Sequence, residues 1–377
     1  MIEAAGARHS IVHRDPSFYC AHPHVAVAAN GDWIVVFNRA PRRPYVLHPP
    51  EEPLFQNVVV RSSDRGSNWS PPEVVPDYGW SGTECAGLTV LRSGRVLLNQ
   101  WRFRWLPLRL ARRLEGTLPL AFPAEFMRGW LASPEHDTAA VRSVPVESLA
   151  PWARGPGETW IHHSDDHGLT FARSVQINTA PFSGGYGMRG ACELADGDIL
   201  LPLSDIPHWR IVFTVRSRDG GMTWDPPVKV AELAGSEFEE PTLVETGPGS
   251  LLMVLRDNGT RWLHSVISND GGETWSMPRR LPLEGYPAQL SPLPGGRLLM
   301  TFGWRQPDYG VRAVLSVDGG ATWDIDRTIR IRGGLPSKNL GYPATILGGE
   351  DELQTVYYGE DRDGATGIMM TTWRLPG

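Results

Sequence analysis

The sequence has few cysteines and lysines, and it lacks long hydrophobic runs and basic blocks. Its three cysteines, Cys20, Cys85 and Cys192, are an odd number without metal-type spacing, so neither disulfides, nor a metal site, nor thiol chemistry is expected. No apolar run approaches the roughly 18 residues of a membrane span, and the N-terminus has no signal-peptide core. These absences favour a cytoplasmic location and exclude a membrane partner.

The charge pattern excludes a further class of partner. The net charge is −6 and no basic block is present, which argues against nucleic acid. Lys229 and Lys338 are the only lysines, so nearly all positive charge is arginine. Arginine forks suit carboxylate ligands, although a GC-rich genome would explain the same bias. No nucleotide-binding glycine-rich loop is present, and no cofactor is expected.

One segment recurs five times, as in SVDGGATW, and its copies begin at Ser62, Ser164, Ser217, Ser268 and Ser316. The later copies lie about 50 residues apart, which is typical of solenoids or propellers. Strand-like hairpins fill the spaces between them, and six such hairpins can be counted. The sequence therefore predicts an all-β fold, a six-bladed β-propeller over residues 1–377.

The first gap between copies is about twice as long as the others. Residues 105–157 fill it with a stretch that lacks strand alternation and includes a helix-like piece, RLARRLEG. We interpret it as a partly helical insertion in the second blade. Three roles are open: a cap over the channel, a homo-oligomer contact, or a plain surface loop.

The repeated segment has the chemistry of a structural fastener. Its Asp can accept N–H bonds within its own turn, its Gly permits positive φ, and its aromatic residue can pack between sheets. The pattern resembles the Asp boxes, or BNR repeats, of the sialidase (neuraminidase) superfamily. This resemblance implies a sialidase-like propeller and an enzyme of glycoside hydrolase type, whereas a fold alone does not name a substrate.

The innermost strands of a propeller start at one mouth of the channel. Aligning them places a ring of polar side chains at matching positions: His22, Glu84, Arg189, Glu240, Tyr286 and Tyr342. Packing alone would not choose such a set, because buried charges are costly unless they are paired or bind a ligand. The alternative is a water-filled channel neck. Asp205, which ends a strand of the third blade, is a secondary candidate.

The resemblance to sialidases implies roles for particular residues. Tyr342 stands where the nucleophilic Tyr would be, and Glu240 where its activating Glu would be, with Glu239 as an alternative register. Arg256 and Arg312 match two of the arginines that clamp the substrate carboxylate. Glu51 and Glu52, which follow the first blade's second strand, are the candidates for the acid/base.

The match fails at the first arginine of the clamp, where this chain has Ala21-His22-Pro23. Arg39 and Arg189 are the candidates to replace it. Three functions stay open: an exo-acting sialidase-like glycoside hydrolase on a terminal, acidic sugar, a polysaccharide lyase acting on a uronate, and a non-catalytic carbohydrate-binding propeller. For a lyase, His22 and the tyrosines would supply the base and acid. All three take a carbohydrate as partner.

Overall fold

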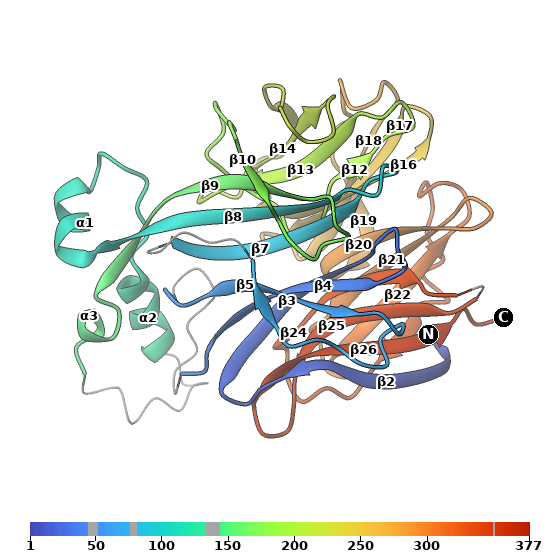
Figure 1. Ribbon diagram of the computed structural model, residues 1–377, viewed down its shortest axis with the longest axis horizontal. Helices are drawn as coiled ribbons and strands as arrows, with labels where there is room; N and C mark the ends of the chain where they lie inside the picture. Colours follow the sequence, from blue (N-terminus) through green and yellow to red (C-terminus); the bar gives the residue numbers. More distant parts are fainter. Residues whose placement is uncertain (44–51, 76–80, 133–143, 350) are drawn as a thin grey trace.

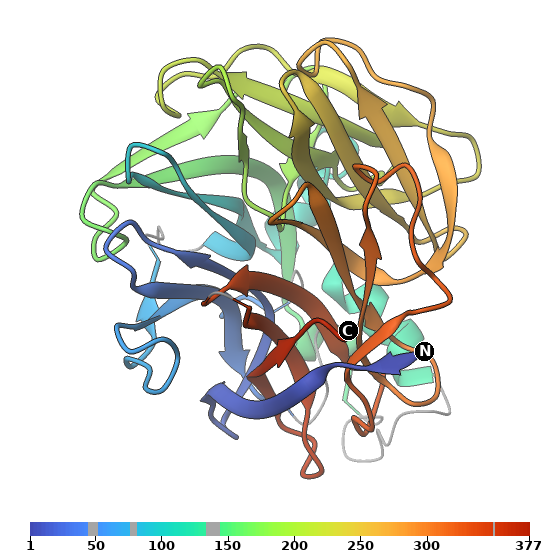
Figure 2. The same ribbon diagram turned by 90° about the vertical axis from the view of Figure 1, so that its right-hand side faces the viewer.

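The computed structural model describes residues 1–43, 52–75, 81–132, 144–349 and 351–377. Its strands form six sheets arranged in a ring, and Figure 2 shows the ring. The prediction of an all-β six-bladed propeller is therefore confirmed.

The first three blades run from the innermost strand outward. The first contains β3 (Phe18–Val27), β4 (Trp33–Pro41), β5 (Gln56–Ser62) and β6 (Glu73–Val74). The second contains β7 (Ser81–Val90), β8 (Val96–Pro107), β9 (Trp152–Ser164) and β10 (Arg173–Ile177). The third contains the short inner pieces β11 (Gly184–Tyr186) and β12 (Cys192–Glu193), followed by β13 (Ile199–Asp205), β14 (Ile211–Ser217) and β15 (Val228–Glu232).

The last three blades follow the same order. The fourth contains β16 (Phe238–Gly247), β17 (Ser250–Asp257), β18 (Trp262–Ser268) and β19 (Arg279–Glu284). The fifth contains β20 (Tyr286–Leu293), β21 (Arg297–Trp304), β22 (Gly310–Ser316) and β23 (Ile329–Arg332). The sixth contains β24 (Leu340–Leu347), β25 (Leu353–Glu360) and β26 (Thr366–Arg374).

The N-terminal segment completes the last two blades. Strand β2 (Ala5–Arg14) pairs antiparallel with β26 as the outer strand of the sixth blade, and β1 (Ile2–Glu3) pairs parallel with β23. Both ends of the chain therefore lie on the same side of the ring (Figure 1). Sequence reasoning did not assign these strands, because their pairing partners stand at the other end of the chain.

The predicted insertion lies at the tip of the β8–β9 hairpin. The two strands stay paired into it, with Trp105 opposite Arg154 and Pro107 opposite Trp152, so its ends at 105–107 and 152–157 are strand. Between them stand α1 (Leu108–Leu114), α2 (Pro123–Ala132) and α3 (Val146–Leu149), which project from one side of the ring in Figure 1. No helix in the described part of the chain is long and apolar enough to cross a membrane.

Each repeated segment begins where the third strand of its blade ends. In the third blade, Ser217 Oγ donates to Asp219 Oδ1 at 2.9 Å, and the Thr223 amide donates to the same oxygen at 2.9 Å. Burial alone would raise the pKa of Asp219, but hydrogen bonds from Thr223 and Ser217 more than offset it and lower the pKa to about 2. Trp224 then packs against the apolar core. The turn is fastened as its sequence predicts.

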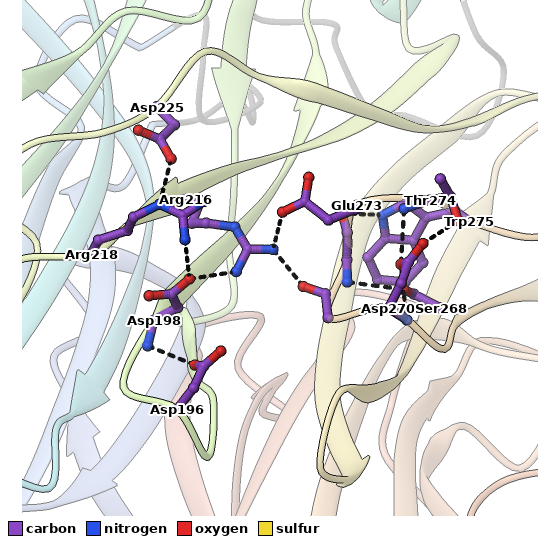
Figure 3. A network of polar contacts seen from close by, with 12 residues as sticks. Asp196, Asp198, Arg216, Arg218, Asp225, Ser268, Asp270, Glu273, Thr274 and Trp275 are labelled. Atoms are coloured by element: carbon purple, nitrogen blue, oxygen red, sulfur yellow. Dashed lines mark hydrogen bonds and ion pairs between the residues drawn. The ribbon is translucent and has the colours of Figure 1, made fainter.

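Residues directly before these segments join one blade to the next. Arg216 binds the Gly271 carbonyl in the following segment, and it also pairs with Asp198 at 2.7 Å and Glu273 at 3.3 Å (Figure 3). Arg61 makes the equivalent bond to the Gly168 carbonyl at 2.8 Å. Each of these contacts ties the third strand of one blade to the repeated segment of the next.

The histidines beside the second repeated segment take part in this architecture. His162 and His163 are both buried. His163 Nε2 lies 2.9 Å from the Gly221 carbonyl of the next blade, and His162 lies between β8 and β10. Their burial follows from positions on the third strand of a packed blade. Among the described residues, no cluster of potential metal ligands is found.

Candidate active site

Three of the ring residues share an unusual backbone geometry. His22, Glu240 and Tyr342 each have φ +55° and each stands before a proline in an innermost strand. The strand pairing shifts register at each of these positions. Positive φ in such residues costs about 1–3 kcal/mol and is concentrated at functional sites. The same bulge therefore places equivalent side chains of the first, fourth and sixth blades.

Tyr342, Glu240 and Arg256 form one hydrogen-bonded cluster. The Tyr342 hydroxyl donates to Glu240 Oε1 at 2.6 Å, and Arg256 Nη1 donates to Glu240 Oε2 at 2.6 Å. Arg256 Nη1 also lies 3.4 Å from the Tyr342 oxygen. Because Glu240 belongs to the fourth blade and Tyr342 to the sixth, their contact reaches past the fifth blade. The contact therefore lies inside the ring of sheets, toward the central axis of the propeller.

The cluster holds its charges in a buried setting. Glu240 and Tyr342 are 2% and 5% exposed. Burial alone would lower the pKa of Arg256, but the carboxylates of Glu240 and Glu239 more than offset it and raise the pKa well above its ordinary value. Glu239 lies farther away, at 3.7 Å from Arg256 Nε. Arg256 therefore stays a cation beside the phenol.

A second arginine, which sequence reasoning missed, lies beside this cluster. The Arg305 guanidinium stands 5.2 Å from the Tyr286 ring centroid and 5.8 Å from the Tyr342 ring centroid. Arg256 lies 4.9 Å from the Tyr286 ring, so Tyr286 lies within cation–π distance of both guanidinium groups. Position along the blade could have identified Arg305. It directly follows the second strand of the fifth blade, and Arg256 stands near the end of the second strand of the fourth.

Arg312, the predicted substrate arginine of this blade, lies over a tryptophan ring. Its guanidinium stacks at 3.8 Å over the Trp304 ring, and burial followed by the charge of Arg330 lowers its pKa. Arg305, by contrast, lies within cation–π distance of the Tyr286 and Tyr342 rings. The structure therefore favours Arg305 over Arg312 as the second cation of the cluster.

His22 completes the cluster on the side of the first blade. Its ring lies 4.1 Å from the Tyr342 ring and 5.6 Å from the Tyr358 ring, measured between centroids. Asn38 lies 3.1 Å from its Nδ1. The structure thus brings together His22, Tyr286, Tyr342, Glu240 and Arg256 from the sequence candidates.

Two ring candidates lie between the second and third blades. Glu84 is 1% exposed and accepts from the Tyr186 hydroxyl at 3.3 Å. Arg189 is also buried, and it stands between β11 and β12, where the inner strand of the third blade is interrupted. Burial, followed by the charge of Arg189, lowers the pKa of His24 to about 3.

The first-blade candidates make contacts of their own. Glu52 is 1% exposed and receives two bonds from Arg43, at 2.9 and 3.1 Å. These two charge-assisted bonds fix the position of the Glu52 side chain. Glu51 lies outside the described residues. Arg39 stacks 4.7 Å from the Phe18 ring centroid.

Asp205 serves a turn. Its Oδ1 accepts hydrogen bonds from the backbone amides of Arg210 and Ile211 at 2.8 and 2.7 Å.

The expectation that cysteine chemistry is absent fits the two described thiols, since burial raises the pKa of Cys20 to about 12 and that of Cys192 to about 11. A thiol with such a pKa is a weak nucleophile at neutral pH.

Comparisons with known proteins show the family. A family model described as a BNR repeat-like domain matches residues 146–354, more than half of the chain. The chain therefore belongs to the BNR repeat-like family, and its six-bladed fold is of the sialidase type.

Individual relatives cover the chain to different extents. An anhydrosialidase from Macrobdella decora is 34% identical over 162 residues, which are 41% of this chain and 20% of that protein. The chain thus matches only a fifth of that relative's length. A Dyadobacter fermentans protein described as of unknown function has a TM-score of 0.81 at 21% identity, covering 98% of this chain and 100% of its own.

A sialidase also shares the fold. The intramolecular trans-sialidase of Ruminococcus gnavus, solved with oseltamivir carboxylate, has a TM-score of 0.66 at 14% identity and covers 99% of this chain and 98% of its own. At such identities the likeness concerns the fold.

Proposed function

We propose that this protein is an exo-acting glycoside hydrolase of the sialidase type that cleaves a terminal acidic sugar. The observation that carries the proposal is the 2.6 Å hydrogen bond from the Tyr342 hydroxyl to Glu240, with Arg256 bound to the same carboxylate. A nucleophile in hydrogen-bond contact with a base, whose own position is fixed by a third group, is the arrangement that covalent catalysis needs.

The first chemical step follows from this geometry. Glu240 takes the phenolic proton as the Tyr342 oxygen bonds to the anomeric carbon, and the bond from that carbon to the leaving oxygen breaks. A carboxylic acid gives the leaving oxygen its proton, and Glu51 and Glu52 are the first-blade candidates. Water then bonds to the anomeric carbon and gives one proton to the acid, and Glu240 returns the phenolic proton as the bond to Tyr342 breaks.

The electrostatics favour an acidic substrate. A phenol is uncharged, so it can approach a carbon that carries a carboxylate without repulsion. The guanidinium groups of Arg256 and Arg305 lie 4.9 and 5.2 Å from the Tyr286 ring centroid, near that phenol. Each charge-assisted bond to a substrate carboxylate contributes about 1.5–3 kcal/mol.

The relatives support the same chemistry and suggest a second product. The leech protein is named an anhydrosialidase, and the Ruminococcus gnavus protein an intramolecular trans-sialidase. In an intramolecular transfer, a hydroxyl of the sugar replaces water in the second step. The product then weighs one water less than the free sugar.

The experiment is a screen of aryl glycosides of sialic acid, uronic acids, arabinose and rhamnose with the wild-type protein and Tyr342→Phe. We expect turnover of an acidic glycoside that is lost in Tyr342→Phe, while circular dichroism shows an unchanged fold. Mass spectrometry of the product separates hydrolysis from intramolecular transfer. Full activity of Tyr342→Phe would refute the assignment of Tyr342 as the nucleophile. A product with a conjugated double bond would show lyase chemistry on a uronate.

A further inference from the structure

A chain of buried amide side chains leads from the second blade to His22. Gln100 of β8 bonds to Asn57 of β5 at 2.9 Å, Asn57 bonds to Asn38 of β4 at 2.6 Å, and Asn38 bonds to His22 Nδ1 at 3.1 Å. The three amide residues are at most 1% exposed. We call Gln100, Asn57 and Asn38 the amide relay.

One end of the amide relay has a fixed polarity. Arg102 Nη2 lies 3.2 Å from Gln100 Oε1, and a guanidinium can only donate. Gln100 must therefore present its oxygen to Arg102, because its NH₂ group would place donor against donor. His162 Nε2 lies 3.0 Å from the same oxygen. Burial, followed by the charge of Arg102, lowers the pKa of His162 to about 3, so His162 is neutral and meets that oxygen with an N–H.

The polarity then passes along the amide relay. With its oxygen facing Arg102, Gln100 donates its Nε2–H to Asn57 Oδ1. Asn57 therefore donates its Nδ2–H to Asn38 Oδ1. The remaining Asn38 group facing His22 Nδ1 is Nδ2–H, a donor. Each amide has one donor end and one acceptor end, so fixing the first orientation fixes all of them.

We infer that the amide relay holds His22 as the neutral tautomer with its proton on Nε2. Nδ1 accepts from Asn38 and cannot carry a proton without placing N–H against N–H. The position that resembles the first arginine of sialidases thus supplies an uncharged hydrogen-bond donor next to Tyr342. Asn38, Asn57 and Gln100 are positioning residues that act through His22.

This assignment has a consequence for recognition, which rests on the proposed function. Charge attraction for an acidic sugar comes from Arg256 and Arg305, whereas His22 offers one N–H to a sugar oxygen beside Tyr342. Reversing the tautomer would turn that donor into an acceptor. We expect such a reversal to lower kcat/KM by about 2- to 10-fold, the weight of one neutral hydrogen bond.

The test is long-range ¹H–¹⁵N spectroscopy of protein labelled with ¹⁵N-histidine, at pH 8, where an ordinary imidazole is neutral. The His22 signal is assigned by its loss in His22→Asn. We expect the unprotonated, strongly downfield nitrogen to be Nδ1. A wild-type spectrum with the proton on Nδ1 overturns the inference, and this measurement requires no further variant and no activity.

Gln100→Glu is the sharper perturbation because Gln100 does not touch His22. The new carboxylate keeps its bonds to Arg102 and His162 but cannot donate to Asn57. Asn57 and then Asn38 must rotate, which presents Asn38 Oδ1 to His22 and moves its proton to Nδ1. We expect the two nitrogen shifts to exchange.

Two further variants frame this result. Asn38→Asp places an acceptor directly at His22 and should cause the same exchange. Gln289→Glu is the matched control, because Gln289 Oε1 already accepts from the Thr345 amide and the Ser291 hydroxyl, so this change should leave His22 as in the wild type. Wild-type shifts in both Gln100→Glu and Asn38→Asp would overturn the relay. If no glycoside is turned over but the shifts exchange, the tautomer stands and the proposed function fails.

Discussion

Replacing Glu240 by Gln tests the assignment of the base most selectively. The change keeps the shape of the side chain and an acceptor for Arg256, but it removes the negative charge that takes the proton from Tyr342 at 2.6 Å. Loss of a positioned general base lowers turnover by about 10²- to 10⁴-fold. We expect kcat to fall within this range.

The chain offers a matched control in the neighbouring residue. Glu239→Gln removes the same charge beside the same arginine, but Glu239 lies 3.7 Å from Arg256 Nε, against 2.6 Å from Glu240 to Arg256 Nη1. We expect each variant to lose about 1–3 kcal/mol of stability, because a buried charge loses a partner. Only Glu240→Gln should lose turnover by the larger factor.

The assay is steady-state kinetics on the glycoside found by the screen, together with urea unfolding of both variants. Equal losses of kcat in Glu239→Gln and Glu240→Gln would refute the reasoning, since they would mean that the charge around Arg256 matters and not the contact with the phenol. Full activity of Glu240→Gln would exclude a base at this position.

Three other outcomes are expected. Arg305→Met should raise KM by about 10-fold or more through loss of a charge-assisted bond, and an unchanged KM would remove Arg305 from the site. Folding lowers the pKa of Asp219 to about 2, so the carboxylate stabilises the fold above its unfolded pKa near 4 and loses this effect as the pH falls toward 2. The difference in melting temperature between wild type and Asp219→Asn should therefore shrink over that pH range. A constant difference would contradict this. Arg216→Met should lower the free energy of unfolding in urea by about 1–3 kcal/mol, because the Gly271 carbonyl loses its donor. Arg218→Met should change it little, because that side chain is 58% exposed. Equal effects would refute the role of Arg216 between blades.

The fold was predictable because its signal is repeated. Each copy of the segment carries its own Ser, Asp and Gly, and local hydrogen bonds such as that from Ser217 to Asp219 depend on neighbours in sequence. The position of Tyr342 followed from the same periodicity, since equivalent points of blades converge. Strand β2 escaped prediction because its partner, β26, lies at the far end of the chain.

The details of the site depended on contacts that periodicity does not encode. Arg305 follows its strand, and only packing shows that its guanidinium reaches Tyr286 and Tyr342. Glu52 fitted an acid/base by position, but its pairing with Arg43 became visible only in three dimensions. The direction of the hydrogen bond at His22 depends on a series of hydrogen bonds that begins in another blade.

The central claim is that Tyr342 forms a covalent bond to the sugar. A substrate analogue with fluorine next to the anomeric carbon and a fluoride leaving group slows the second step more than the first, so the intermediate accumulates. After proteolysis, mass spectrometry should find the sugar on the peptide that contains Tyr342, and none in Tyr342→Phe. An active wild-type protein that carries the sugar on another residue, or carries none, would contradict the account.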